Sequence, residues 1–172
     1  MRTGHKRTTL LTMAAAAAAA AIVGLAVPAG AAPMAKKAVS GTEHFQAMTT
    51  SGTATTQGVI AWGVFTAPGV DHQTSGTADT FVFPGGSVKL THTNGTGPVS
   101  QNPKTCLLTG TIHGTYKLTA GTGAFKGISG HGTYVATILG IFPKTKKGAC
   151  SQSAAPVAWQ QEISASGPVT LP

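Results

Sequence analysis

The chain has 172 residues, of which 41% are hydrophobic and 9% are charged, and its formal net charge is +8. The one dense basic cluster consists of Lys144, Lys146 and Lys147, and it contains neither arginine nor interleaved aromatic residues that could contact bases. These features exclude nucleic acid as the expected partner and favour a solvated loop, with contact to anionic envelope polymers as the alternative.

Residues 1–31 contain the three parts of a secretory signal peptide in order. The positive n-region is formed by Arg2, Lys6 and Arg7. Residues 10–27 are uncharged and apolar, and Ala29-Gly30-Ala31 places small residues at the expected cleavage site. The apolar run approaches the ~18 residues of a membrane-spanning helix, so an uncleaved anchor is the alternative, but its many alanines favour cleavage. We expect a signal-peptide helix, cleavage after Ala31, and a secreted or envelope-associated mature protein that meets the membrane only during export.

The mature chain would consist of a flexible leader over 32–41 and one domain over 42–172. Cleavage removes three of the 12 basic residues and leaves nine against four acidic residues, a charge of +5. Both cysteines, Cys106 and Cys150, lie in this domain. An exported chain with two cysteines predicts one disulfide, which would contribute about 4 kcal/mol by restricting the unfolded chain.

The mature chain has an all-β composition, because threonine and glycine are abundant whereas glutamate and leucine are scarce. Turn signals separate eight predicted strands, at 42–50, 57–66, 76–83, 86–94, 105–111, 113–119, 130–141 and 156–166. Eight strands with short connections favour a closed antiparallel barrel, which leaves no exposed strand edge. A two-sheet β-sandwich is the alternative architecture.

Strand alternation predicts which polar side chains share a face with apolar ones. Asp79 has the parity of Phe81, and His92 has the parity of Leu90. By the same rule, Tyr134 shares a face with Ala136 and Ile138, and Gln161 shares a face with Trp159 and Ile163. These residues could face the interior of a barrel.

A glycine-rich pattern follows the predicted strand at 113–119, in the segment Gly121-Thr122-Gly123-Ala124-Phe125-Lys126-Gly127. It resembles the Gly-Gly-Thr-Gly-x-Phe/Tyr-x-Gly signature of allene-oxide-cyclase-like and dirigent-like barrels, with Ala120 in place of the first glycine. Asp79-Thr80-Phe81-Val82-Phe83 and Asn102-Pro103-Lys104-Thr105-Cys106 also resemble exported bacterial members of this group. The resemblance covers most of residues 42–166.

The resemblance implies an eight-stranded barrel that shapes a ligand in its interior. Plant allene oxide cyclases close a fatty-acid-derived epoxide in an apolar cavity, and dirigent proteins orient the coupling of phenoxy radicals. Both dimers and trimers occur among such barrels, so the oligomeric state stays open. Shared barrels do not imply shared reactions.

Asp79 and His92 are the candidate catalytic residues, because an inward carboxylate among aromatic side chains would be desolvated. Tyr134, Gln161 and Trp62 are the candidate ligand-binding residues. The alternatives are a strand-end or backbone-amide partner for Asp79, satisfied polar groups near the barrel ends for His92, Tyr134 and Gln161, and a core position for Trp62. The histidines after residue 31 include no His-x-His or other local ligand pair, so we expect neither a metal site nor a cofactor.

Sparse ionisable residues favour a non-catalytic exported barrel that binds a small apolar molecule or acts as an envelope or extracellular interaction module. The alternative is an enzyme, a cyclase or isomerase acting on an oxylipin- or terpenoid-like substrate. The enzyme predicts a sealed apolar cavity that Asp79 or His92 enters, so we expect the volume of the barrel cavity to discriminate between the two functions.

Overall fold

The structure, a computed structural model, describes residues 37–151 and 153–172. The expected signal-peptide helix and residues 32–36 of the expected leader lie outside these ranges. Within the described ranges, no helix is long and apolar enough to cross a membrane. The first strand begins at Val39, so the end of the 32–41 leader belongs to the sheet.

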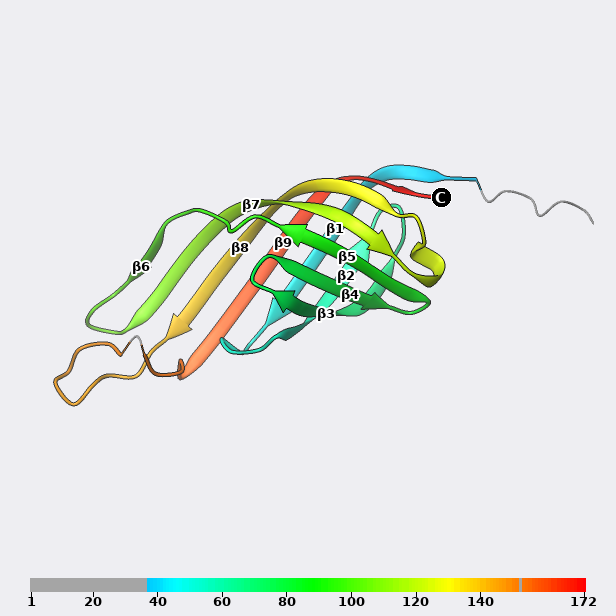
Figure 1. Cartoon of the computed structure of the whole chain (residues 1–172). Helices are drawn as coiled ribbons and strands as arrows, with labels where there is room; N and C mark the ends of the chain where they lie inside the picture. The colour runs from blue at the N-terminus through cyan, green and yellow to red at the C-terminus, as the bar shows by residue number, and fades with distance from the viewer. Residues whose placement is uncertain (1–36, 152) are drawn as a thin grey trace, which may run out of the picture. The chain divides into compact units, whose positions relative to one another are not determined.

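The described residues form nine strands and one short 3-10 helix, η1 (Figure 1). Their bounds in chain order are β1 Val39–Thr49, β2 Thr56–Trp62, β3 Ala67–Ser75, β4 Ala78–Phe83, β5 Gly86–His92, β6 Val99–Gln101, β7 Leu107–Gly121, η1 Gly123–Phe125, β8 Ser129–Ile141 and β9 Ala158–Leu171.

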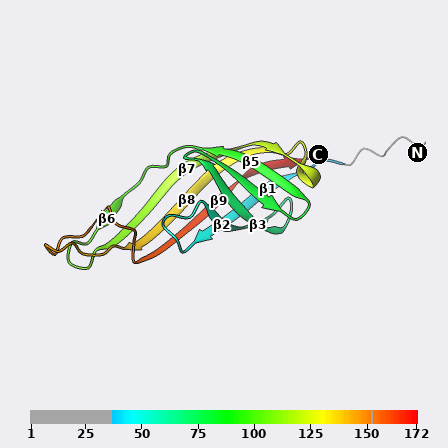
Figure 2. The ribbon, with the colours of Figure 1, turned by 60° about the horizontal axis from the view of Figure 1, so that its bottom comes forward.

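All strand pairs within the described ranges are antiparallel, and eight of the strands close into a barrel. The circuit runs β1-β2-β3-β4-β5-β7-β8-β9 and returns to β1. It closes where β5 pairs with the second half of β7, for example through Leu90 and Leu118. The extra strand β6 pairs with the first residues of β7, outside the circuit (Figure 2). This closure confirms the barrel and excludes the sandwich.

The sequence predicts eight strands, but the eight in the barrel differ from the predicted ones. The segments 105–111 and 113–119 belong to one long strand, β7. Neither β3, at Ala67–Ser75, nor the short β6 is among the predicted strands. β3 escapes prediction because its inward positions toward the barrel mouth are the polar Asp71 and Gln73, so it has no apolar alternation.

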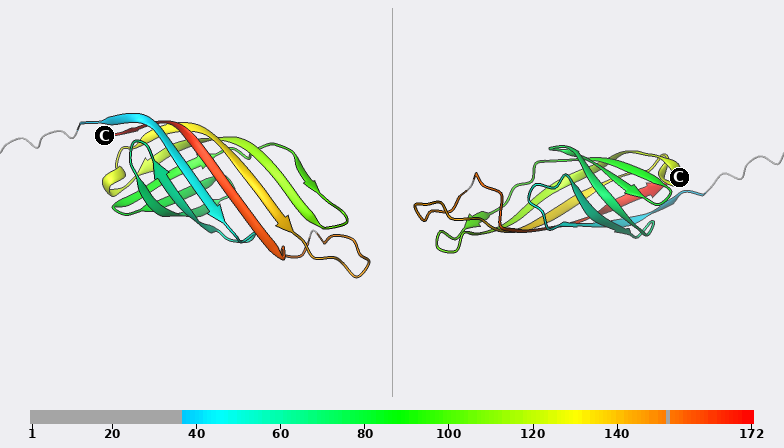
Figure 3. Two further views of the ribbon diagram at one scale, coloured as in Figure 1. Left: turned by 180° about the vertical axis from the view of Figure 1, so that it is seen from behind. Right: turned by 90° about the horizontal axis from the view of Figure 1, so that it is seen from below.

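β1, β9 and β8 lie side by side as one wall of the barrel (Figure 3). Aromatic side chains fill the end of the barrel near the turn at Gly85 and η1. Phe125 is 4% exposed, and its ring centroid lies 4.8 Å from that of Phe65 and 5.6 Å from that of Phe83. Burial of these rings makes this the closed end of the barrel.

A buried carboxylate fixes the β2–β3 turn at the closed end. Glu43 is fully buried, and its Oε2 accepts hydrogen bonds from the backbone N–H groups of Val64 (2.6 Å) and Phe65 (3.1 Å). Gly63 enters this turn with a φ of 134°, which L side chains rarely adopt. Burial raises the pKa of Glu43, and the two backbone donors oppose that rise. Glu43 therefore has a structural role.

Candidate functional site

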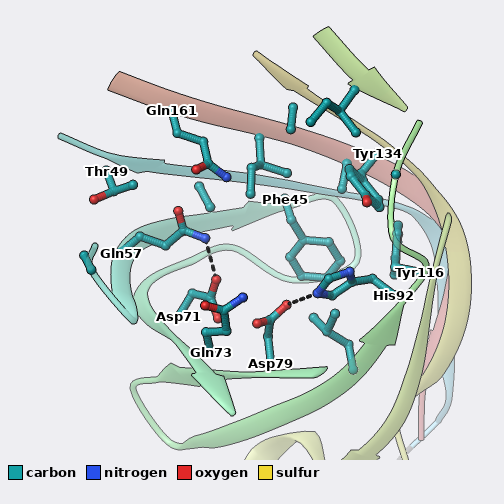
Figure 4. A pocket seen from close by; sticks show the side chains of 18 of the residues that line it. Phe45, Thr49, Gln57, Asp71, Gln73, Asp79, His92, Tyr116, Tyr134 and Gln161 are labelled. Atoms are coloured by element: carbon teal, nitrogen blue, oxygen red, sulfur yellow. Dashed lines mark hydrogen bonds and ion pairs between the residues drawn. The ribbon is translucent and has the colours of Figure 1, made fainter. Parts of the chain in front are cut away.

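The opposite end of the barrel contains a cavity of ≈ 450 Å³. This volume is in the usual range for small-molecule sites. Apolar side chains from several strands line it: Phe45, Ala47, Phe81, Leu90, Ala136, Ile138, Ile163 and Ala165. Polar side chains gather nearer the mouth and include Gln57, Asp71, Gln73, Asp79, His92 and Gln161 (Figure 4).

Four of the five candidate site residues from the sequence line this cavity. Asp79 lies at the start of β4, His92 ends β5, Tyr134 lies in β8, and Gln161 lies near the start of β9. Their strands run in alternating directions, so these positions meet at one end of the barrel. Strand alternation therefore identifies inward-facing side chains that lie far apart in the sequence but line the same cavity.

Trp62 is placed elsewhere. Its side chain is 40% exposed at the end of β2 and stacks on His44, with ring centroids 5.3 Å apart. It is not among the residues that line the cavity. The expected alternative, a core position for Trp62, is wrong, because its strand position points away from the interior.

Asp79 and His92 form an ion pair, with Oδ2 and Nε2 3.2 Å apart. The other ring nitrogen of His92, Nδ1, lies 3.0 Å from the backbone oxygen of Thr93. Because a carbonyl oxygen can only accept, this contact assigns a proton to Nδ1. Ionised Asp79 places a negative charge beside Nε2, and this charge offsets any positive charge on the imidazole.

Asp71 is a buried carboxylate that sequence reasoning missed. Its Oδ2 accepts a 2.7 Å hydrogen bond from Nε2 of Gln57, and the residue is 3% exposed. Its Oδ1 is buried without a hydrogen-bond partner among the described residues. Burial raises the pKa of Asp71 to about 6, and the charge of Asp79 adds to that rise, whereas Gln57 and His92 oppose it. Recognition of β3 as a strand would have placed Asp71 in the interior.

Burial also raises the pKa of Asp79, and the neighbouring His92 opposes the rise. Two carboxylates and one imidazole thus share the mouth of the cavity. Among the described residues that line it, none is a lysine or an arginine. Because Asp79 offsets any positive charge on His92, ionised Asp71 adds a negative charge that no side chain of the described lining compensates.

Two tyrosines enter the cavity from neighbouring strands. Tyr134 donates a 2.8 Å hydrogen bond to the backbone oxygen of Thr93, and its ring packs edge-on against His92 with centroids 5.9 Å apart. Tyr116 is 6% exposed, and its hydroxyl oxygen is buried without a partner among the described residues. Burial raises the pKa of Tyr116 to about 12, with a contribution from Glu43, so this hydroxyl is protonated at neutral pH.

Cys106 and Cys150 form a disulfide, with Cα atoms 5.3 Å apart, as the sequence predicts. It links the turn before β7 to the connection between β8 and β9 and does not line the cavity. Such a bond is consistent with an oxidising, extracytoplasmic location. Within residues 37–151 and 153–172, no three His, Cys, Asp or Glu side chains form a group that could hold a metal ion.

No protein-family model matches the sequence, and neither a curated protein nor a solved structure matches the chain. The architecture therefore rests on the strand pairing itself. The described part of the chain is a closed, eight-stranded antiparallel β-barrel with one extra strand and the Cys106–Cys150 disulfide.

Proposed function

We propose that this protein is an extracytoplasmic barrel that binds a small, largely apolar molecule in the cavity at its open end. The observation that carries the proposal is the cavity itself: ≈ 450 Å³, lined by apolar side chains such as Phe45, Phe81 and Ile163 together with a similar number of polar side chains. In small-molecule sites, burial of apolar groups supplies affinity and polar groups fix the orientation of the ligand. The disulfide and the signal-like N-terminus support the location.

A cavity-filling substitution tests the proposal. Ala165 lines the cavity on β9, and the neighbouring Ser164 is exposed on the outer face of the same strand. The variant Ala165→Phe should fill part of the cavity, whereas Ser164→Phe adds the same side chain outside it. The probe is N-phenyl-1-naphthylamine, an uncharged apolar fluorophore whose emission rises when it leaves water.

The wild-type protein and Ser164→Phe should bind this fluorophore saturably, and Ala165→Phe should bind it about tenfold more weakly or not at all. Circular dichroism checks that both variants are folded. Native mass spectrometry of the protein mixed with lipid extract provides a second measurement. The proposal is contradicted if the wild-type protein binds neither the fluorophore nor any component of the lipid extract, or if the two variants bind the fluorophore equally.

The Asp79–His92 pair favours a second candidate function, an isomerase or cyclase that acts in the same cavity. A carboxyl and an imidazole in contact can donate a proton to one atom of a substrate and accept a proton from another. The likeness of Gly121–Gly127 to the allene-oxide-cyclase-like and dirigent-like barrels supports this alternative. If Asp79→Asn and His92→Gln leave a detected turnover unchanged, the pair is not its catalytic group.

A further inference from the structure

We infer that the cavity selects ligands whose polar end is a protonated amine, which pairs with Asp71, and that it discriminates against carboxylates. The inference rests on the proposed ligand-binding function and adds the charge of the ligand to it. Its basis is the buried, unpartnered carboxylate oxygen of Asp71 among the described cavity residues, together with the charges that surround it.

Only one of the two carboxylate oxygens of Asp71 has a hydrogen-bond partner among the described residues. Gln57 donates to Oδ2, whereas Oδ1 is buried and has no partner within the described residues, and the residue as a whole is only 3% exposed. Burial of a carboxylate oxygen without a donor is unfavourable. Because Asp71 lines the cavity, a small shift of its side chain would bring Oδ1 to an N–H donor of a ligand. That hydrogen bond removes the cost, and an ammonium group also supplies the opposite charge.

The neighbouring groups leave the charge of Asp71 uncompensated. Nε2 of His92 contacts Asp79 and Nδ1 contacts the backbone oxygen of Thr93, and the negative charge of Asp79 offsets any positive charge on the imidazole. The cavity lining contains no lysine or arginine among the described residues. One negative charge therefore remains beside an apolar space, where electrostatic interactions are stronger than in water.

The arrangement around Asp71 suits an amine with an apolar body. Gln73 lies beside Asp71 on the same strand and faces the same cavity, so its amide oxygen can accept a second ammonium proton (Figure 4). The ring of Phe45 lies deeper in the cavity, next to the ring of Phe81 at 5.4 Å between centroids. A carboxylate in the same position would meet a like charge and no lysine or arginine from the described lining.

Three ligands with one shared naphthalene body test the inference: 2-naphthylmethylamine, 2-naphthalenemethanol and 2-naphthoate. Isothermal titration calorimetry at pH 7.5 should show that the full mature protein binds the amine about tenfold or more tightly than the alcohol. The carboxylate should bind most weakly of the three. Because the naphthalene body is constant, differences report the polar end.

Two variants assign the preference to Asp71. Asp71→Asn should bind the amine and the alcohol with similar affinity, because the charge is removed while an acceptor for Gln57 is kept. Glu162→Gln is the matched control, since Glu162 accepts a hydrogen bond from Gln46 on the outer face and does not line the cavity. It removes the same charge and should keep the preference for the amine.

Failure of the inference and failure of the proposed function give different results. If 2-naphthoate binds the wild-type protein as tightly as the amine, or if Asp71→Asn keeps the amine preference, the inference is overturned and ligand binding stands. The same holds if the uncharged fluorophore binds and the amine does not. If neither the fluorophore nor any of the three ligands binds, the proposed function itself is overturned. The wild-type comparison decides the inference even if Asp71→Asn does not fold.

Discussion

Asp71 and Gln57 are joined by a 2.7 Å hydrogen bond that uses one carboxylate oxygen, while the other oxygen is buried without a partner among the described residues. The pKa of Asp71 is raised from 3.8 to about 6, chiefly because burial disfavours the charged form. The folded protein therefore binds more protons than the unfolded chain between about pH 4 and pH 6, and stability falls as pH rises through that window. At neutral pH the ionised group destabilises the fold.

The variant Asp71→Asn should accordingly be more stable than the wild-type protein at pH 7.5, by about 1–2 kcal/mol. This is below the full effect of the pKa rise, because the new amide N–H group is left without an acceptor. The difference should shrink below about pH 4, where Asp71 is protonated in both the folded and unfolded states. Urea unfolding of the variant and the wild-type protein, at pH 7.5 and below about pH 4, measures the stability difference under each condition. A variant less stable than wild type at pH 7.5 would show that Asp71 stabilises the barrel.

Gly114 leaves room for the ring of Tyr134, its partner in the β7–β8 register. A Cβ atom at Gly114 would lie 2.5 Å from Cζ and 2.6 Å from the hydroxyl oxygen of Tyr134, so the ring must move in Gly114→Ala. The movement should break the hydrogen bond to Thr93 and narrow the cavity. We expect about tenfold weaker binding of N-phenyl-1-naphthylamine.

The control for that variant is Gly58→Ala on β2, where an added Cβ meets nothing within 4 Å. It should bind the fluorophore as the wild-type protein does. Equal binding by Gly114→Ala and Gly58→Ala would mean that Tyr134 does not shape the cavity.

The Cys106–Cys150 disulfide should stabilise the barrel without shaping the ligand site. Its two cysteines are 44 residues apart, and restricting a loop of that length contributes about 4 kcal/mol in the chain-entropy model. Reduction should therefore lower the urea midpoint strongly. Ligand affinity of the folded fraction should stay unchanged, because neither cysteine lines the cavity. Unfolding with and without a phosphine reductant, followed by fluorophore titration, checks both; an unchanged midpoint would contradict the expected stabilisation.

The sequence predicts the barrel and four of the cavity residues, because alternation of apolar and polar residues can be recognised in strands whose inward positions are apolar. Prediction fails where the site departs from that rule. β3 is missed because Asp71 and Gln73 occupy inward positions, and β7 is wrongly divided at Ile112. Both errors fall at the cavity, since all three residues line it. There, polar groups replace the apolar alternation on which the prediction depends.

The charges at the mouth of the cavity predict opposite effects of two substitutions on Asp71. The charge of Asp79 raises the pKa of Asp71, and His92 lowers it. The variant Asp79→Asn should therefore bring the pKa of Asp71 below about 6, and His92→Gln should move it higher. Carbon-13 NMR titration of the aspartate carboxyl groups measures both shifts, with Glu162→Gln as a control on the outer face.

The direction of these shifts also bears on ligand binding. A carboxyl that titrates higher is less ionised at neutral pH, so His92→Gln should weaken binding of 2-naphthylmethylamine more than binding of the corresponding alcohol. Asp79→Asn should leave Asp71 ionised. The ratio of the amine affinity to the alcohol affinity should therefore change less than it does in His92→Gln. If both variants move the pKa of Asp71 in the same direction, Asp79 and His92 do not act on Asp71 through opposite charges. The negative charge at the mouth could then not be assigned to Asp71 alone.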